Sequence, residues 1–303
     1  MKLRSPEKTE DPHGIPETIL EKVNYLKLIN SHLVTHPKVW ETFTHFLQNW
    51  IENPKGKLLY LTVIGSRRYG LCLNDDDADV DFVAIYQTDP RDFFGLSNPS
   101  LTWTNSSDES QHKLDDDITT HELKKFGIML AAENPTAIEL LWGVKQNVYM
   151  IADEFLPLLS SRGRFITVRS MAAFRGFGMS QFRNAQERIE KGKAESLIRK
   201  SLYHAVRGLY ECIHILNEGR PHIFIKYDNE HRVLMQIRKG TLSIEETRQT
   251  YQELLKKVDD QISSPHQEFH LPTDYSTNNQ WLENWMVNTR LAYCKKFKIK
   301  PLN

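Results

Sequence analysis

The stretch that decides the fold is VIGSRRYGLCLNDDDADVDFVAIY, residues 63–86. An apolar run ends there at a glycine–serine pair, five aspartates fall within residues 75–81, and a second apolar run follows. Neighbouring carboxylates repel one another by very roughly 1 kcal/mol per close pair near a surface. The cluster therefore predicts a partner that neutralises its charge.

The two apolar runs predict buried strands. Residues 57–65 form a run that is too short for a helix and ends at Gly65, and residues 80–86 are rich in β-branched and aromatic side chains. Alternate residues of a strand face the same side, so we expect Asp79 and Asp81 to project together and bind a hard cation. Mg²⁺ is the expected ion, with Mn²⁺ as its substitute, and such a pair suits phosphoryl or nucleotidyl transfer.

Three other phosphate or metal motifs do not fit this stretch. Gly65 and Gly70 match a Walker A loop, but Leu71 and Cys72 stand where that motif requires Lys and Ser or Thr. The aspartates begin like an EF-hand loop, but Val80 replaces its glycine. The GxGxxG sequence of a dinucleotide-binding fold is absent.

The rest of the chain predicts helices around a small sheet. Apolar residues three or four apart predict helices over residues 16–33 and 37–54, and a third strand is expected near residues 115–121. Helices are also expected at 122–133 and 134–143, and residues beyond 155 look mainly helical. The predicted class is α/β, with a small mixed sheet in residues 1–150 and a helical part in residues 151–303.

Composition sets limits on the class of protein. The 303 residues are 40% hydrophobic and 26% charged, which is typical of a soluble globular protein. Apolar runs fall short of the ~20 residues that span a bilayer, so no membrane partner is expected. Three widely separated cysteines predict reduced thiols and an intracellular location.

Charge is unevenly distributed although the net charge is zero. Residues 69–122 hold thirteen acidic and two basic side chains, whereas residues 162–200 hold ten basic and three acidic ones. On a helix Lys200, His204 and Arg207 fall within about 60° of one another, opposite an apolar face. This stripe is expected to face away from the core and bind phosphate or a nucleotide acceptor, with a solvated surface as the alternative.

Several motifs together resemble a known family. Gly65-Ser66 followed by Asp79-Val80-Asp81 is similar to the signature of the DNA polymerase β superfamily of minimal nucleotidyltransferases. The blocks GSRRYGL, DITTHELKKFGIMLAAENPTAIELLWG and KSLYHAVRGLYECIHILNEGR resemble the YcgL-type predicted nucleotidyltransferases linked to RNA repair. The resemblance covers roughly residues 58–260. Ala78 stands where this family commonly has a serine.

The resemblance implies roles for single residues. Gly65 and Ser66 would contact the triphosphate, Asp79 and Asp81 would hold the metals, and Asp117 would be the third carboxylate, near the acceptor hydroxyl. Asp115 and Asp116 compete with Asp117 for that role.

The two arginines after Ser66 have two possible roles. Arg67 or Arg68 could offset triphosphate charge, or could pair with a nearby aspartate.

The implied reaction is transfer of a nucleoside monophosphate from an NTP to a hydroxyl, with RNA as the expected acceptor and with release of pyrophosphate. AMP transfer to a protein or small-molecule hydroxyl is one alternative. A catalytically silent nucleotide- or RNA-binding module is the other.

Overall fold

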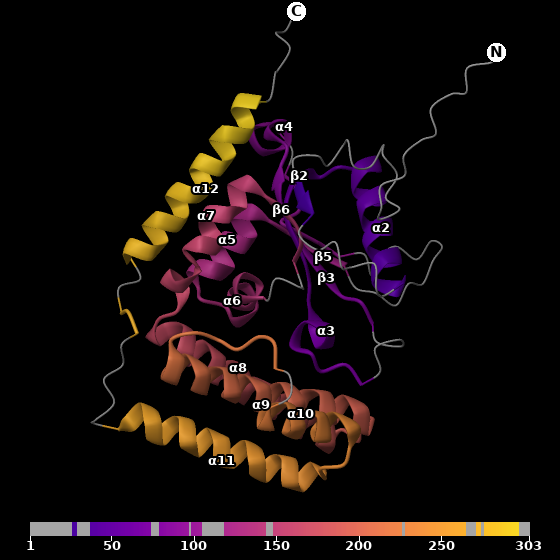
Figure 1. Cartoon of the computed structure of the whole chain (residues 1–303), viewed down its shortest axis with the longest axis vertical. Helices are drawn as coiled ribbons and strands as arrows, with labels where there is room; N and C mark the ends of the chain where they lie inside the picture. The colour runs from indigo at the N-terminus through magenta and orange to yellow at the C-terminus, as the bar shows by residue number, and fades with distance from the viewer. Residues whose placement is uncertain are drawn as a thin grey trace, which may run out of the picture.

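The computed structural model describes residues 26–28, 37–73, 79–96, 98–104, 118–143, 148–225, 228–264, 271–273 and 276–296. These residues form a mixed sheet with helices on both faces and a further layer of helices beside it (Figure 1). The predicted α/β class, with a small mixed sheet followed by a mainly helical part, is confirmed.

The sheet has the strand order β1-β6-β2-β3-β5-β4. Strands β3 and β5 run parallel, and the other neighbouring pairs are antiparallel. Every residue of β3 is buried, as are all residues of β2 after its first, which explains the continuous apolar runs in the sequence. The strands are β1 (Leu26–Leu28), β2 (Gly56–Val63), β3 (Phe82–Thr88), β4 (Thr102–Thr104), β5 (Ile118–Glu122) and β6 (Val148–Ala152).

Aromatic side chains attach helices to both faces of the sheet. Trp50 of α2 (Pro37–Glu52) packs edge-on against Tyr86, with ring centroids 5.4 Å apart. On the opposite face Phe155 stacks on Tyr60 at 4.7 Å and also contacts Trp285. That face is covered by the helices α5 (Leu123–Ala131), α7 (Leu156–Ser160) and α12 (Ser276–Lys296), as Figure 1 shows.

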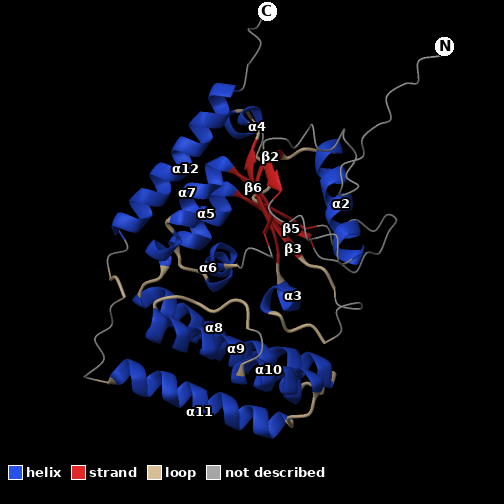
Figure 2. Ribbon diagram, in the orientation of Figure 1, coloured by secondary structure: helices blue, strands red, loops and turns tan. Residues whose placement is uncertain are grey.

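Four longer helices form the layer beside the sheet (Figure 2). They are α8 (Val168–Glu190), α9 (Glu195–Glu218), α10 (Asn229–Lys239) and α11 (Ile244–Ser263). Reciprocal capping boxes at Thr167 and Ser243 begin α8 and α11. None of the helices in the described ranges is long and apolar enough to cross a membrane.

The remaining elements are short. They are the helices α3 (Gly65–Tyr69), α4 (Pro90–Phe94) and α6 (Pro135–Trp142), with two 3₁₀ turns at Asp153–Phe155 and Arg162–Phe165. Asn134 accepts a hydrogen bond from the Thr136 amide and caps α6, the helix expected over 134–143.

One predicted helix is wrong where it can be compared with the structure. Residues 26–28, inside the helix expected over 16–33, form the edge strand β1, in which Leu28 pairs with Met150. The alternating sequence Leu-Lys-Leu fits a strand as well as a helix, and pairing with β6 decides between them. The other residues of that predicted helix lie outside the described ranges. The helix expected over 37–54 is confirmed as α2.

A buried carboxylate on α6 joins the sheet region to the helical layer. Glu139 accepts a hydrogen bond from the Tyr69 hydroxyl at 2.6 Å and pairs with the Arg207 guanidinium of α9 at 2.7 Å. The guanidinium also lies over the Tyr69 ring, 4.0 Å from its centroid. One carboxylate therefore ties together α3, α6 and α9.

Glu211 lies one turn further along α9 and is fully buried. Burial raises the pKa of this carboxyl well above its usual range, although it accepts a hydrogen bond from the His222 amide at 2.8 Å. The raised pKa favours the neutral form of Glu211, in which Arg207 and Glu139 remain as the charged pair.

We predict that Glu139→Gln lowers the free energy of unfolding by about 3 kcal/mol, because it leaves the Arg207 charge buried without its anion. Urea denaturation followed by tryptophan fluorescence measures this change. The control Glu187→Gln removes an exposed carboxylate that pairs with Lys191 at 3.3 Å, and should change stability by less than about 1 kcal/mol.

The double variant Glu139→Gln/Arg207→Met should recover part of the lost stability, because it removes the uncompensated charge. Equal effects of Glu139→Gln and the exposed control would contradict this role for Glu139.

Candidate active site

The glycine–serine pair forms a tight turn directly after β2. Gly65 has a φ of +69°, a left-handed conformation that favours glycine, and it begins the short helix α3. The Leu71 amide donates to the Ser66 carbonyl at 2.9 Å and closes the turn. The Ser66 hydroxyl lies 3.6 Å from the Cys72 sulfur.

The two predicted metal ligands lie beside this turn. Asp79 is exposed and Asp81 is partly buried, whereas Val80 between them is fully buried. This alternation agrees with the prediction that the two carboxylates project to the same side. The Ile64 amide donates to the Asp81 carbonyl at 2.8 Å, and a Cβ at Gly65 would stand only 2.5 Å from Asp81 Oδ2. The lack of a side chain at Gly65 therefore makes room for the Asp81 carboxylate.

A cleft of about 540 Å³ separates the turn from the helical layer. Its first wall is formed by the turn and the aspartate pair, and its second wall by α9 and α10. The lining residues are Gly65, Ser66, Leu73, Asp79 and Asp81 on the first wall and Ser196, Arg199, Lys200, Tyr203, His204 and Arg238 on the second. Carboxylates therefore face basic side chains across one opening.

Lys200 and His204 both lie on the second wall, as the stripe on α9 predicted. Lys200 is exposed and His204 is partly buried. Burial, with help from the nearby charges of Arg207, Lys200, Arg238 and Arg188, lowers the pKa of His204 to about 3. The imidazole is therefore neutral at physiological pH and adds no positive charge to the cleft.

Arg207 requires a correction. The helical pattern placed it on a stripe facing away from the core, but its side chain is buried in the pair with Glu139 and does not line the cleft. The angle of a residue around a helix does not show which neighbour covers it. Glu139 of α6, which is distant in the sequence, pairs with Arg207 and holds its side chain inside the protein.

The two arginines of α3 also lie outside the cleft lining. Arg67 is partly buried and Arg68 almost completely buried. The Arg68 guanidinium lies against Gly143, where an added Cβ would be 2.7 Å from Nη2. Asp117 and its competitors Asp115 and Asp116 lie outside the described residues.

The sequence pattern did not indicate the two arginines, Arg199 and Arg238, that line the cleft. Arg238 donates to the Leu71 carbonyl and lies over the Tyr203 ring, 5.3 Å from its centroid. Arg199 donates to the Leu242 carbonyl at 2.7 Å and pairs with Glu195 at 2.6 Å. Arg199 directly precedes Lys200 in the chain, so proximity could have suggested it, whereas nothing in the sequence relates Arg238 to α9.

We predict that Gly65→Ala destabilises the protein by about 1–2 kcal/mol, the cost of a left-handed backbone at a residue with a side chain. It should also weaken Mn²⁺ binding, measured by electron paramagnetic resonance, because the new methyl group displaces the Asp81 carboxylate. The matched control is Gly176→Ala in α8, where an added Cβ meets nothing within 4 Å. That variant should gain about 0.5–1 kcal/mol. Unchanged Mn²⁺ binding in Gly65→Ala would contradict this role of the turn.

A second prediction concerns acid stability. The unfolded chain protonates His204 near its ordinary value of 6.5, but the folded protein does so only near pH 3. Below pH 6.5 the unfolded chain binds a proton that the folded protein does not, so the free energy of unfolding falls as the pH falls toward 3. This loss is about 2 kcal/mol at pH 5 and is absent above pH 6.5. His204→Gln should therefore flatten the fall in unfolding free energy between pH 6.5 and 4.5, measured by urea denaturation. His45→Gln on α2 controls for removing any histidine, and an unchanged slope in His204→Gln would contradict the prediction.

Comparisons with known proteins complete the description of the site. No curated protein matches the chain. A nucleotidyltransferase-like protein from Exiguobacterium sibiricum 255-15, known from a crystal structure, is similar at 11% identity and a TM-score of 0.29, covering 84% of this chain and 74% of that one. A model of the RNA repair pathway DNA polymerase beta family (RlaP) matches residues 39–288. The chain therefore belongs to this family, as its motifs predicted, and membership supports a nucleotidyltransferase function.

Proposed function

We propose that the protein transfers a nucleoside monophosphate from an NTP to a hydroxyl acceptor, with Mg²⁺ or Mn²⁺, and releases pyrophosphate. The observation that carries this proposal is the cleft in which Asp79, Asp81 and the Gly65–Ser66 turn face Lys200. Carboxylates suit hard divalent ions, and a cation across the opening suits a triphosphate. Such a reaction belongs to EC class 2.7.7.

The residues present fit a divalent ion. Asp79 and Asp81 place two carboxylates on the same cleft, and the space left at Gly65 accommodates one of them. Oxygen ligands of this kind are those that Mg²⁺ prefers. When bound, the metal neutralises the triphosphate and lowers the pKa of the attacking hydroxyl.

The third carboxylate of the proposed site is Asp117. It lies outside the described residues, but support comes from the parallel pairing of Phe82 with Ile118. This register brings the beginnings of β3 and β5 together, and Asp117 directly precedes β5 in the sequence as Asp81 precedes β3.

The protein's own groups have distinct tasks in the transfer. The Ser66 hydroxyl and the backbone amides of the turn bind the terminal phosphates, with Lys200 and Arg238 on the other wall. The acceptor oxygen attacks the α-phosphorus, and the bond from that phosphorus to the bridging oxygen of the pyrophosphate breaks. Asp117 accepts the proton of the acceptor hydroxyl. The neutral His204 can offer a hydrogen bond but no charge.

Residues 1–150 carry the metal and triphosphate groups in this proposal, and residues 151–303 supply the opposite wall. The limit between these parts falls inside β6, and α12 returns to the sheet. RNA is the proposed acceptor, and the family description supports it. The three cysteines, which form no disulfide, are consistent with the proposed intracellular setting.

The decisive experiment incubates the protein with each α-labelled NTP, Mg²⁺ or Mn²⁺, and either total RNA or a protein extract. We expect label in RNA, reduced at least 100-fold by Asp81→Asn, because this change removes a charged metal ligand but keeps the side chain's size. Asp260→Asn, on the exposed surface of α11, is the matched control and should retain full activity.

Each other outcome argues against the RNA proposal in its own way. Label in protein would replace the RNA acceptor with a protein hydroxyl. Nucleotide binding without label under any condition would indicate a silent binding module. Equal activity of Asp81→Asn and the wild-type protein would refute the metal site itself.

A further inference from the structure

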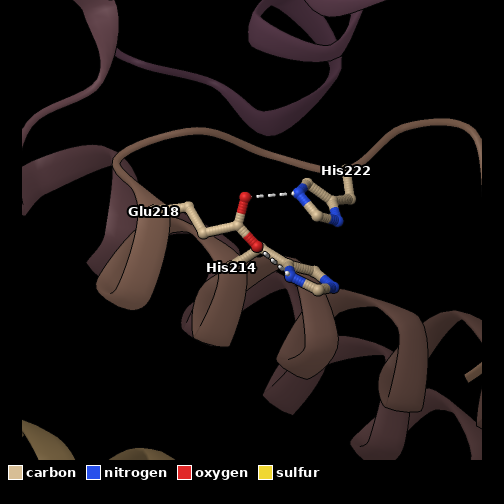
Figure 3. Close-up of side chains that lie close together, drawn as sticks. All are labelled: His214, Glu218 and His222. Carbon is tan, nitrogen blue, oxygen red and sulfur yellow. Dashed lines mark hydrogen bonds and ion pairs between the residues drawn. The ribbon is translucent and has the colours of Figure 1, made fainter.

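A second cluster of metal-ligating side chains lies at the end of α9, and its residues do not line the cleft. His214, Glu218 and His222 each offer one ligand atom, and these atoms all lie within 4.8 Å of one another. Figure 3 shows the Glu218 carboxylate beside the two imidazoles, with one oxygen toward each ring. Its Oε1 lies 3.6 Å from His214 Nδ1, and its Oε2 lies 2.7 Å from His222 Nε2.

Helix geometry explains why two of these side chains meet. His214 and Glu218 are four residues apart on α9, so they lie on the same face of the helix. The helix ends at Gly219, whose φ of +67° turns the chain back. His222 follows three residues later and returns over the last turn of the helix, as Figure 3 shows.

A carboxylate on another helix orients the His214 ring through a hydrogen bond. Glu230 of α10 lies 2.8 Å from His214 Nε2, on the side of the ring away from Glu218. If Nε2 donates its proton to Glu230, Nδ1 is left as the free lone pair facing Glu218. Histidine ligands of metals almost always make such a second hydrogen bond, which fixes the tautomer and the direction of the ring.

The two imidazoles stack on each other beside Glu218. The ring centroids of His214 and His222 are 3.9 Å apart and the rings are inclined by 18°. Both rings therefore present a nitrogen to the same carboxylate.

We propose that His214, Glu218 and His222 form a binding site for a divalent transition metal, with Zn²⁺ as the best-matched ion. Two imidazoles and one carboxylate are a donor set suited to Zn²⁺, not to Mg²⁺, which prefers oxygen ligands alone. Ligand bonds of 2.0–2.2 Å place donors roughly 3.4 Å apart around a tetrahedral ion, so binding would draw together the three donor atoms, which now lie within 4.8 Å of one another. This site is distinct from the proposed catalytic Asp79–Asp81 site.

The position of the site indicates what the metal does. The chain after His222 packs against the end of α3: the Ile225 amide donates to the Tyr69 carbonyl at 3.0 Å, and the Phe224 ring lies against Gly70. The His222 amide is itself bound to Glu211. A metal would therefore fix the segment 220–225, which contacts Tyr69 and Gly70 at the end of α3.

The test uses the metal-free protein of residues 1–303 and measures binding directly. We expect one equivalent of Zn²⁺ by isothermal titration calorimetry, visible d–d absorption on adding Co²⁺, and a higher melting temperature with Zn²⁺. His214→Ala/His222→Ala should weaken Zn²⁺ binding at least 100-fold. Glu230→Gln should weaken it roughly tenfold, as loss of an outer-shell carboxylate does.

Two controls separate this site from other sources of binding. His45→Ala, on α2 beside the sheet, should bind Zn²⁺ as the wild-type protein does. Asp81→Asn should also keep Zn²⁺ binding, so failure of the catalytic proposal would leave this result unaffected. Circular dichroism verifies that each variant is folded.

Three outcomes would overturn the proposal. They are no saturable Zn²⁺ or Co²⁺ binding by the wild-type protein, binding that is unchanged in His214→Ala/His222→Ala, and Mg²⁺ binding at the same three residues with equal affinity.

Discussion

The structure depends on one buried charge pair, Glu139 with Arg207. This pair joins α6 to α9, the helix that carries Lys200, and charge-assisted hydrogen bonds of this kind fix distance more strictly than apolar contacts do. The Tyr69 hydroxyl brings the turn itself into the same network. Glu139, Arg207 and Tyr69 do not line the cleft, so this network supports the two walls from outside it.

The cleft combines two electrostatic environments that no single element could supply. The carboxylates stand on the exposed margin of the sheet, where water and a metal can reach them. The opposite helices keep only part of their basic charge available: Lys200 is exposed, whereas Arg207 is balanced within the core and His204 is neutral. A moderate positive wall suits the proposed reaction, in which a triphosphate enters the cleft and pyrophosphate leaves it.

Local signals in the sequence were sufficient for one half of the site and not for the other. The turn glycine and the alternation around Val80 are properties of neighbouring residues, so the order of residues along the chain was enough to place Gly65, Asp79 and Asp81 together. Contacts between segments that are distant in the sequence leave no such local pattern in it. Periodicity gave the direction of Arg207 around its helix, but not the acid that covers it. Arg238 reaches the cleft through packing of α10, which no spacing in the chain encodes.

The last helix of the fold has a consequence for biosynthesis. Trp285 of α12 packs on Phe155 and donates to the Glu154 carbonyl at 3.0 Å, and Arg290 pairs with Glu122 at 2.8 Å. These partners leave the ribosome more than a hundred residues before α12 does. The part of this face that α12 covers is therefore open from the synthesis of Phe155 until α12 has been made, and an apolar surface left open on a nascent chain is exposed to aggregation and to chaperones.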